Sequence, residues 1–207
     1  MSLQVLPYGS DCLLLRSALP RGLASARRMA QLAQAVCAVE WVREAVAGWN
    51  ELACFLQPPA DPGDEALSQH LADLAAQTLQ QPLPALAGRE HHIPVRYHGP
   101  DLAAVAQALA MSPADVVAAH QACPCTVGVM GFRPYFAYCL GLSPALRLPR
   151  KAQPSMLAAG AVAMVEDMSA IYPSDGPGGW HVLGHTDPAC CRQLQLGDVL
   201  HFVEQAS

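Results

Sequence analysis

The segment IYPSDGPGGWHVLGHT, Ile171–Thr186, restricts the possible folds of this chain more than any other stretch. It holds four glycines, two prolines, one tryptophan and two histidines, but only one formal charge. We expect one strand to end at Ile171-Tyr172-Pro173 and the next to begin at Trp180. Between them, glycines that accept positive φ and a proline that fixes one turn predict a tight, stiff loop.

Within this loop, Gly178 and Gly179 allow the backbone to approach a neighbour closely. Two interpretations stay open from the residues alone. The glycines turn a corner of a barrel, or their N–H groups help to form a pocket for an anion or a carbonyl group.

The C-terminal part of the chain reads as a mainly-β domain, residues 89–207. From Cys125 onward it consists of short apolar runs separated by glycine and proline, such as TVGVMGF, GAVAMVE and DVLHFVE. Such runs without intervening helices predict a closed or nearly closed barrel. Before them, SPADVVAAHQA predicts a helix with Ser112 at its N-cap, Asp115 three residues later and His120 in its last turn.

The first part, residues 1–88, reads as a small α+β domain. Two pairs of short strands alternate with two helices, over PRGLASARRMAQLAQAV and GDEALSQHLADLAAQTLQQ. This order predicts one small sheet with helices on one face, in a ferredoxin-like arrangement. The proline- and glycine-containing stretch QQPLPALAGREHH, residues 80–92, is the predicted linker.

Composition limits the classes of partner. Twelve Lys and Arg against seventeen Asp and Glu give a net charge of −5, without a basic stripe, so we expect no nucleic-acid partner. The N-terminus does not resemble a signal peptide and no apolar run is long enough to cross a bilayer, so we expect a cytoplasmic protein with no membrane partner. Charged residues make up only 14%, where about 25% is typical, which indicates a surface covered by a protein partner.

The eight cysteines predict free thiols rather than a disulfide framework. Zinc ligands usually occur as C-x-x-C or H-x-x-x-H pairs, whereas this chain has Cys123-Pro-Cys125 and Cys190-Cys191. We therefore predict no metal site.

Three groups of residues are candidates for chemistry. His120 lies where a helix dipole favours the imidazolium, although a histidine that only caps the helix is equally compatible. Arg147 and Arg150 lie in the proline-flanked stretch LRLPRKAQP, where the planar guanidinium of an arginine suits a carboxylate or phosphate, or they are solvated surface arginines. In GFRPYFAYCLGL, Phe132, Phe136 and Tyr138 form an apolar wall with Pro134, or these aromatic residues belong to the core. We interpret His181 and His185 as structural.

An ordered series of motifs resembles a known family. HIPVRYHGPDL, the helix that ends in His120, the GFRP segment, PR, the IYPSDGPGGWHVLGHT segment and LGDVLHF follow one another from His92 to about Val203. The series is similar to that of the allophanate hydrolase subunit 1 family. That family includes the B component of the bacterial ATP-dependent 5-oxoprolinase and a sporulation-kinase inhibitor.

The resemblance implies a cyclophilin-like barrel as the second domain, a homologous second subunit of the allophanate hydrolase subunit 2 type as partner, and ATP-driven opening of a cyclic amide. Because an unstrained lactam is a poor electrophile, such a site must bind phosphate groups and stabilise oxyanion charge. No G-x-x-x-x-G-K-S/T motif is present, so any ATP site is family-specific or shared with the partner. The resemblance implies His120, Arg150 and Asp175 as catalytic residues, and Phe132, Pro134, Tyr138, Tyr172, Gly178, Gly179 and Trp180 as substrate-binding residues.

The sequence also departs from the family pattern. Ser155 stands where an arginine is expected, Tyr135 replaces a glycine, and a carboxylate pair, Glu166-Asp167, replaces part of a glycine-rich stretch, so we expect a more acidic pocket. Three functions therefore remain: a subunit of a 5-oxoprolinase-type hydrolase, a non-catalytic regulator with a histidine kinase as partner, or an enzyme subunit with a changed, less anionic substrate.

Overall fold

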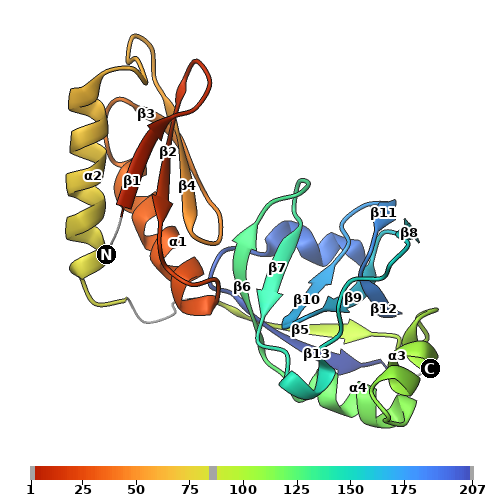
Figure 1. Cartoon of the computed structure of the whole chain (residues 1–207). Coiled ribbons are helices and arrows are strands. Elements are labelled where there is room, and N and C mark those ends of the chain that lie inside the picture. The colour runs from red at the N-terminus through yellow and green to blue at the C-terminus, as the bar shows by residue number, and fades with distance from the viewer. Residues whose placement is uncertain (1–2, 84–87, 206–207) are drawn as a thin grey trace. The chain divides into compact units, whose positions relative to one another are not determined.

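The computed structural model describes residues 3–83 and 88–205 and divides into two compact units, Met1–Ala85 and Leu86–Ser207 (Figure 1). Each unit has its own cluster of buried apolar residues. The predicted linker includes residues 84–87, which lie outside the described residues.

The N-terminal unit has the predicted order of elements, with two strand pairs and two helices in alternation. Its four strands form one antiparallel sheet in the order β1-β2-β4-β3. The two helices contact each other and the strands, and both contribute to one core. The elements are β1 (Leu3–Pro7), β2 (Cys12–Ser17), α1 (Leu23–Cys37), β3 (Val42–Ala47), β4 (Glu51–Leu56) and α2 (Glu65–Gln80).

Local sequence signals explain these elements. Along β4, every second residue is buried, as expected for a strand with one face against a core. Helix α2 begins where the Asp64 carboxylate accepts a hydrogen bond from the Ala66 N–H, and its fully buried Leu71 and Ala75 face the sheet core. Gly9 takes φ +70° in the turn between β1 and β2.

The C-terminal unit is built on a seven-stranded sheet in the order β12-β9-β10-β7-β6-β13-β5, beside a two-stranded ribbon of β11 and β8. Strand β9 is buried throughout and lies in the interior of this sheet. The elements are β5 (Glu90–Val95), α3 (Leu102–Ala108), α4 (Pro113–Gln121), β6 (Cys125–Met130), β7 (Ala137–Leu140), η1 (Pro144–Leu146), β8 (Ser155–Leu157), β9 (Ala161–Val165), β10 (Met168–Ile171), β11 (Gly176–Gly178), β12 (His181–His185), η2 (Pro188–Gln193) and β13 (Val199–Glu204).

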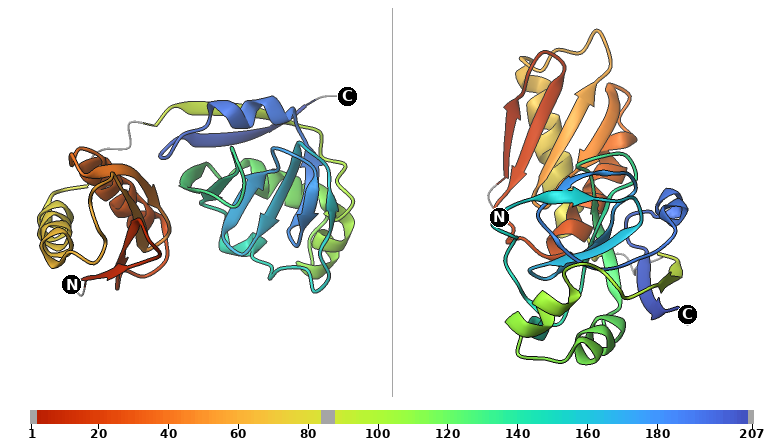
Figure 2. Two further views of the ribbon diagram at one scale, coloured as in Figure 1. Left: turned by 90° about the horizontal axis from the view of Figure 1, so that it is seen from above. Right: turned by 90° about the vertical axis from the view of Figure 1, so that its right-hand side faces the viewer.

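The two ends of this sheet meet. Strand β5 runs parallel to β13 along one edge (Figure 2), and directly after β5 the backbone of Arg96 pairs with that of His185 at the end of β12. The two N–H groups donate to the opposite carbonyl oxygens at 2.9 and 3.0 Å. The sheet is therefore a nearly closed barrel, which supports the expected cyclophilin-like description of this part of the chain.

Helix α4 begins as the sequence predicts. The Ser112 hydroxyl accepts a hydrogen bond from the Asp115 N–H, the Asp115 carboxylate accepts one from the Ser112 N–H, and Pro113 occupies the first turn. This reciprocal cap satisfies two donors that a helix N-terminus otherwise leaves unpaired. His120 lies in the last turn, as expected.

The glycine-rich loop differs from our expectation in one respect. Gly176, Gly178 and Gly179 do not adopt positive φ, which occurs instead at glycines outside this loop, such as Gly141 and Gly160. Gly176–Gly178 instead forms β11 and pairs with β8. Close approach requires a glycine at position 178, because a Cβ there would lie 2.4 Å from the hydroxyl oxygen of the buried Tyr172. A Cβ on Gly179 would meet no atom nearer than 3.8 Å.

Among residues 3–83 and 88–205, all eight cysteines are free thiols, and no group of three or more His, Cys, Asp or Glu could hold a metal ion. Within the same residues, no single helix is long and apolar enough to span a membrane. Helices α3 and α4 reach the required length and composition only as a pair, across a bend of 94°.

Candidate functional site

A cavity of about 230 Å³ in the C-terminal unit gathers most of the predicted site residues. Its walls come from the β6–β7 connection and β7, the loop before β8, and the segment that runs from the end of β10 through β11 to the residue before β12. The cavity is lined by Phe132, Phe136, Tyr138, Arg150, Pro154, Tyr172, Pro177, Gly178, Gly179 and Trp180.

Aromatic rings form the apolar wall of this cavity. Phe136 lies at their centre, with ring centroids 4.9 Å from Tyr138, 5.2 Å from Tyr172 and 5.9 Å from Trp180, all in edge-to-face contacts. Phe136, Tyr172 and Trp180 are almost fully buried, whereas Phe132 is 62% exposed at the rim. Edge-to-face pairs of this kind add stability beyond the area that they bury. The cavity therefore has a rigid wall and an exposed aromatic rim.

Arg133 fixes the loop between β6 and β7 against the glycine-rich segment. Its guanidinium donates to the backbone oxygens of Ser174 and Asp175 at 3.1 and 3.2 Å, and it lies 4.5 Å from the Phe132 ring centroid. A Cβ on Gly176 would lie 2.7 Å from this guanidinium, so a larger residue there would displace the Arg133 side chain. Phe132 keeps φ +68°, a conformation that is uncommon for a bulky residue.

Arg150 brings a positive charge to the cavity. The loop that presents it is held because the Lys151 N–H donates to the Gly179 carbonyl oxygen at 2.8 Å, and the Lys151 ammonium lies 2.8 Å from an Asp101 carboxylate oxygen. Among the described residues, the Arg150 guanidinium has no hydrogen bond or ion pair. Burial raises the pKa of the Tyr172 phenol, and the positive charges of Arg133 and Arg150 partly oppose this rise.

The structure brings together seven of the ten predicted site residues. Arg150 and six of the predicted substrate-binding residues line the cavity, whereas Pro134, His120 and Asp175 do not. Pro134 is exposed in the β6–β7 connection. The six substrate-binding residues are Phe132, Tyr138, Tyr172, Gly178, Gly179 and Trp180.

His120 lies in the barrel core and is fully buried. Its Nδ1 is 2.8 Å from the Tyr97 hydroxyl, its Nε2 is 3.0 Å from the Ser169 hydroxyl, and its ring contacts Phe202. The expectation that the helix dipole favours its charged form is wrong, because burial lowers the His120 pKa to about 4. The imidazole is therefore neutral at neutral pH and bonded on both sides.

Asp175 is exposed, and its carboxylate accepts a hydrogen bond from the Ala159 N–H at 2.7 Å. Asp175 thus ties the glycine-rich segment to the chain that precedes β9.

The expectation that Glu166 and Asp167 make the pocket more acidic is wrong. They form the two-residue turn between the paired strands β9 and β10 and do not line the cavity.

Sequence reasoning missed the residues that shape the cavity from behind. Arg133 was not singled out, although it lies inside the GFRP segment, and the Lys151–Asp101 pair joins residues fifty positions apart. The nearby sequence signals are the GFRP motif, which contains Arg133, and the Gly-Pro-Asp triplet that ends at Asp101. Neither motif indicates which distant part of the chain the Arg133 or Asp101 side chain contacts.

The family model described as "Carboxyltransferase domain, subdomain C and D" matches residues 3–195 of this chain. The chain belongs to this family. The B component of 5-oxoprolinase from Escherichia coli O157:H7 is 33% identical over 95% of this chain and 94% of its own length. The corresponding 5-oxoprolinase component of Haemophilus influenzae is 28% identical over 97% of both chains. These matches confirm the resemblance to the allophanate hydrolase subunit 1 family.

Solved structures share the fold of this chain. TTHA0988 has a TM-score of 0.78 and 32% identity over 96% of this chain, which spans only 40% of that longer chain. The Kluyveromyces lactis urea amidolyase has a TM-score of 0.73 at 15% identity over 98% of this chain and 15% of its own, which shows the fold alone.

Proposed function

We propose that this chain is one subunit of a heteromeric, ATP-dependent amide hydrolase of the 5-oxoprolinase type, and that the aromatic cavity binds the cyclic amide. The observation that carries the proposal is the combination of Arg150 with the rings of Tyr172 and Trp180 in one small cavity. The kinship with a protein named as a 5-oxoprolinase component supports the substrate class.

The substrate, 5-oxoproline, is a five-membered lactam with one carboxylate. An aromatic wall suits the flat, partly apolar ring, and an arginine without an ion pair among the described residues suits the carboxylate. Because Arg150 is itself exposed, solvent screens this charge pair, and the contact of the ring with the aromatic wall supplies the rest of the affinity. The ring amide is then held in a defined orientation toward the cavity mouth.

We assign ATP to a site completed by the homologous second subunit. A cavity of about 230 Å³ with Arg150 in its lining suits one small carboxylate better than a triphosphate. In the overall reaction, ATP phosphorylates the lactam oxygen and leaves as ADP, one water adds to the activated carbon, and the C–N bond breaks to give γ-glutamyl phosphate. A second water then hydrolyses this acyl phosphate to glutamate and phosphate. In this scheme, the chain supplies orientation and exclusion of water.

His120 has a positioning role in this proposal. It is fully buried and bonded to Tyr97 and Ser169, so it holds the end of α4 against β10 and contacts no substrate. Asp175 likewise orients the glycine-rich segment through the Ala159 N–H.

The test is reconstitution of the chain with its homologous second subunit and measurement of 5-oxoproline-dependent ATP hydrolysis. We expect Arg150→Ala to raise the KM for 5-oxoproline at least tenfold, because the carboxylate loses its charge partner, whereas Arg147→Ala, an exposed residue outside the cavity, leaves KM unchanged. Equal KM values for both variants, or no turnover in the reconstituted complex, would contradict the proposal. Binding to a histidine kinase without any subunit partner would favour the regulatory alternative.

A further inference from the structure

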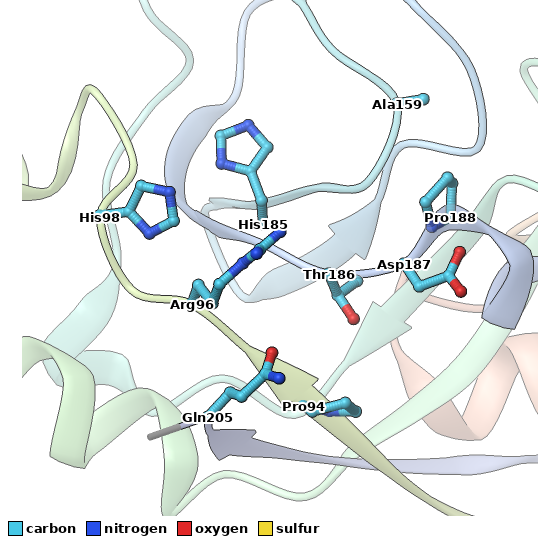
Figure 3. A pocket seen from close by; sticks show the side chains of 9 residues that line it. All are labelled: Pro94, Arg96, His98, Ala159, His185, Thr186, Asp187, Pro188 and Gln205. Atoms are coloured by element: carbon cyan, nitrogen blue, oxygen red, sulfur yellow. The ribbon is translucent and has the colours of Figure 1, made fainter. Parts of the chain in front are cut away.

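A second pocket lies at the seam where the barrel closes (Figure 3), and none of its lining residues lines the aromatic cavity. It has a volume of about 700 Å³, within the range of small-molecule sites. Arg96 and His185, whose backbones pair at the seam, both line this pocket, so its position is fixed by the closure of the sheet. This seam pocket is lined by Pro94, Arg96, His98, Ala159, His185, Thr186, Asp187, Pro188 and Gln205.

One side of the seam pocket is cationic. Arg96, His98 and His185 lie together there (Figure 3), and the two imidazole ring centroids are 5.8 Å apart. Burial lowers the His185 pKa, and the nearby His98 and Arg96 lower it further because they repel a second positive charge. Within the described residues, the Arg96 guanidinium has no hydrogen bond or ion pair. An anion placed between these groups would relieve the repulsion.

The opposite side carries an acceptor. Figure 3 shows Asp187 and Pro188 across the pocket from the histidines, with the amide of Gln205 between the two sides. One Asp187 oxygen caps η2 through the Ala189 N–H at 2.8 Å. Within the described residues the other oxygen has no hydrogen bond. The pocket is therefore polarised, with positive charge on one side and negative charge on the other.

We propose that the seam pocket binds a free amino acid, with its carboxylate at Arg96 and His185 and its ammonium group at Asp187. Arginine and imidazolium groups suit carboxylate oxygens, and a carboxylate with an open oxygen suits an ammonium group. The arrangement disfavours a polyphosphate, because Asp187 would repel it. The proposal does not rest on the function assigned to the aromatic cavity.

The test is calorimetric titration of the full chain with L-glutamate and with glutarate, which lacks the ammonium group. We expect glutamate to bind more tightly than glutarate. Arg96→Gln should weaken both at least tenfold. Asp187→Asn, which retains the ability to cap η2, should weaken glutamate but not glutarate. The control variant Arg147→Gln, at an exposed arginine outside the pocket, should change neither affinity.

The charged and titratable groups that face the ligand are Arg96, His98, His185 and Asp187. Because the His185 pKa is lowered from 6.5, this imidazole gains its proton as pH falls below about 6.5, and glutamate affinity should rise there, an increase that His185→Gln should reduce. The proposal fails if glutamate does not bind, if Arg96→Gln binds it as tightly as the unmodified chain, or if inorganic phosphate binds in its place. Thermal unfolding of each variant separates loss of binding from loss of fold.

Discussion

At the scale of single residues, the buried imidazole of His120 makes the stability of the barrel depend on pH in the acid range. Burial lowers its pKa to about 4, whereas an unfolded chain binds the proton near pH 6.5. The unfolded state therefore holds more protons between these values, so stability is lost as pH falls from about 6.5 toward 4. The slope from this one group reaches about 1.4 kcal/mol per pH unit.

We predict that His120→Gln flattens this part of the stability curve. The measurement is denaturant unfolding at a series of pH values, with His181→Gln as the control, since His181 is only partly buried. The lowered pKa of Asp198 also causes loss of stability in acid, so the readout is the difference in slope between the variant and the unmodified chain. An unchanged slope in His120→Gln would show that this imidazole is already protonated, or solvated, in the folded barrel.

At the scale of elements, closure of the barrel depends on a contact that only glycine permits. A Cβ on Gly184 would lie 2.4 Å from the Arg96 carbonyl oxygen, which belongs to rigid backbone and is part of the seam. We therefore expect Gly184→Ala to destabilise the C-terminal unit by about 1–3 kcal/mol. Hydrogen exchange should show the Arg96 and His185 amides losing protection first, because their mutual hydrogen bonds must lengthen.

The matched control for this prediction is Gly131→Ala, where an added Cβ meets nothing within 4 Å and φ is not positive. It should leave both stability and exchange at the seam unchanged. If Gly184→Ala behaves like this control, the seam tolerates displacement, and the barrel is less firmly closed than the Arg96–His185 pairing indicates.

The sequence predicts the helices and strands better than it predicts which distant segments they contact. Helix α4 was predictable because Ser112, Pro113 and Asp115 act within one turn, and the strands because alternation and breakers are local signals. The pairing of Gly176–Gly178 with β8 was not predictable, since it joins segments through backbone atoms. The seam pocket was likewise missed, because Arg96 and His185 are brought together only when the sheet closes.

The same distinction explains the candidate site. Residues of the glycine-rich segment and of the GFRP segment could be selected from sequence because their types carry the chemistry of a pocket. His120 was placed correctly in its helix but wrongly charged, because a helix dipole is a local property and burial is a property of the whole barrel.

At the scale of the whole molecule, large exposed apolar side chains gather around the aromatic cavity. Phe132 at 62%, Tyr135 at 52% and Met156 at 73% are exposed, and Met156 pairs with the cavity-lining Pro177. Together with the low content of charged residues, this rim favours a surface that a second subunit covers. In that arrangement the cavity would be completed by the partner, as the proposed hydrolase requires.

We therefore predict that Phe132→Asp and Met156→Asp each weaken association with the homologous second subunit at least tenfold, about 1.4 kcal/mol. Aspartate tolerates the positive φ of position 132 better than most residues, so the first substitution should not disturb the loop. The control is Tyr8→Asp, which replaces an equally exposed aromatic residue, 65% exposed, in the N-terminal unit. Calorimetric titration with the purified second subunit measures the affinity of all three variants. Weakening by Tyr8→Asp alone would move the interface to the N-terminal unit and leave the aromatic cavity without a covering partner.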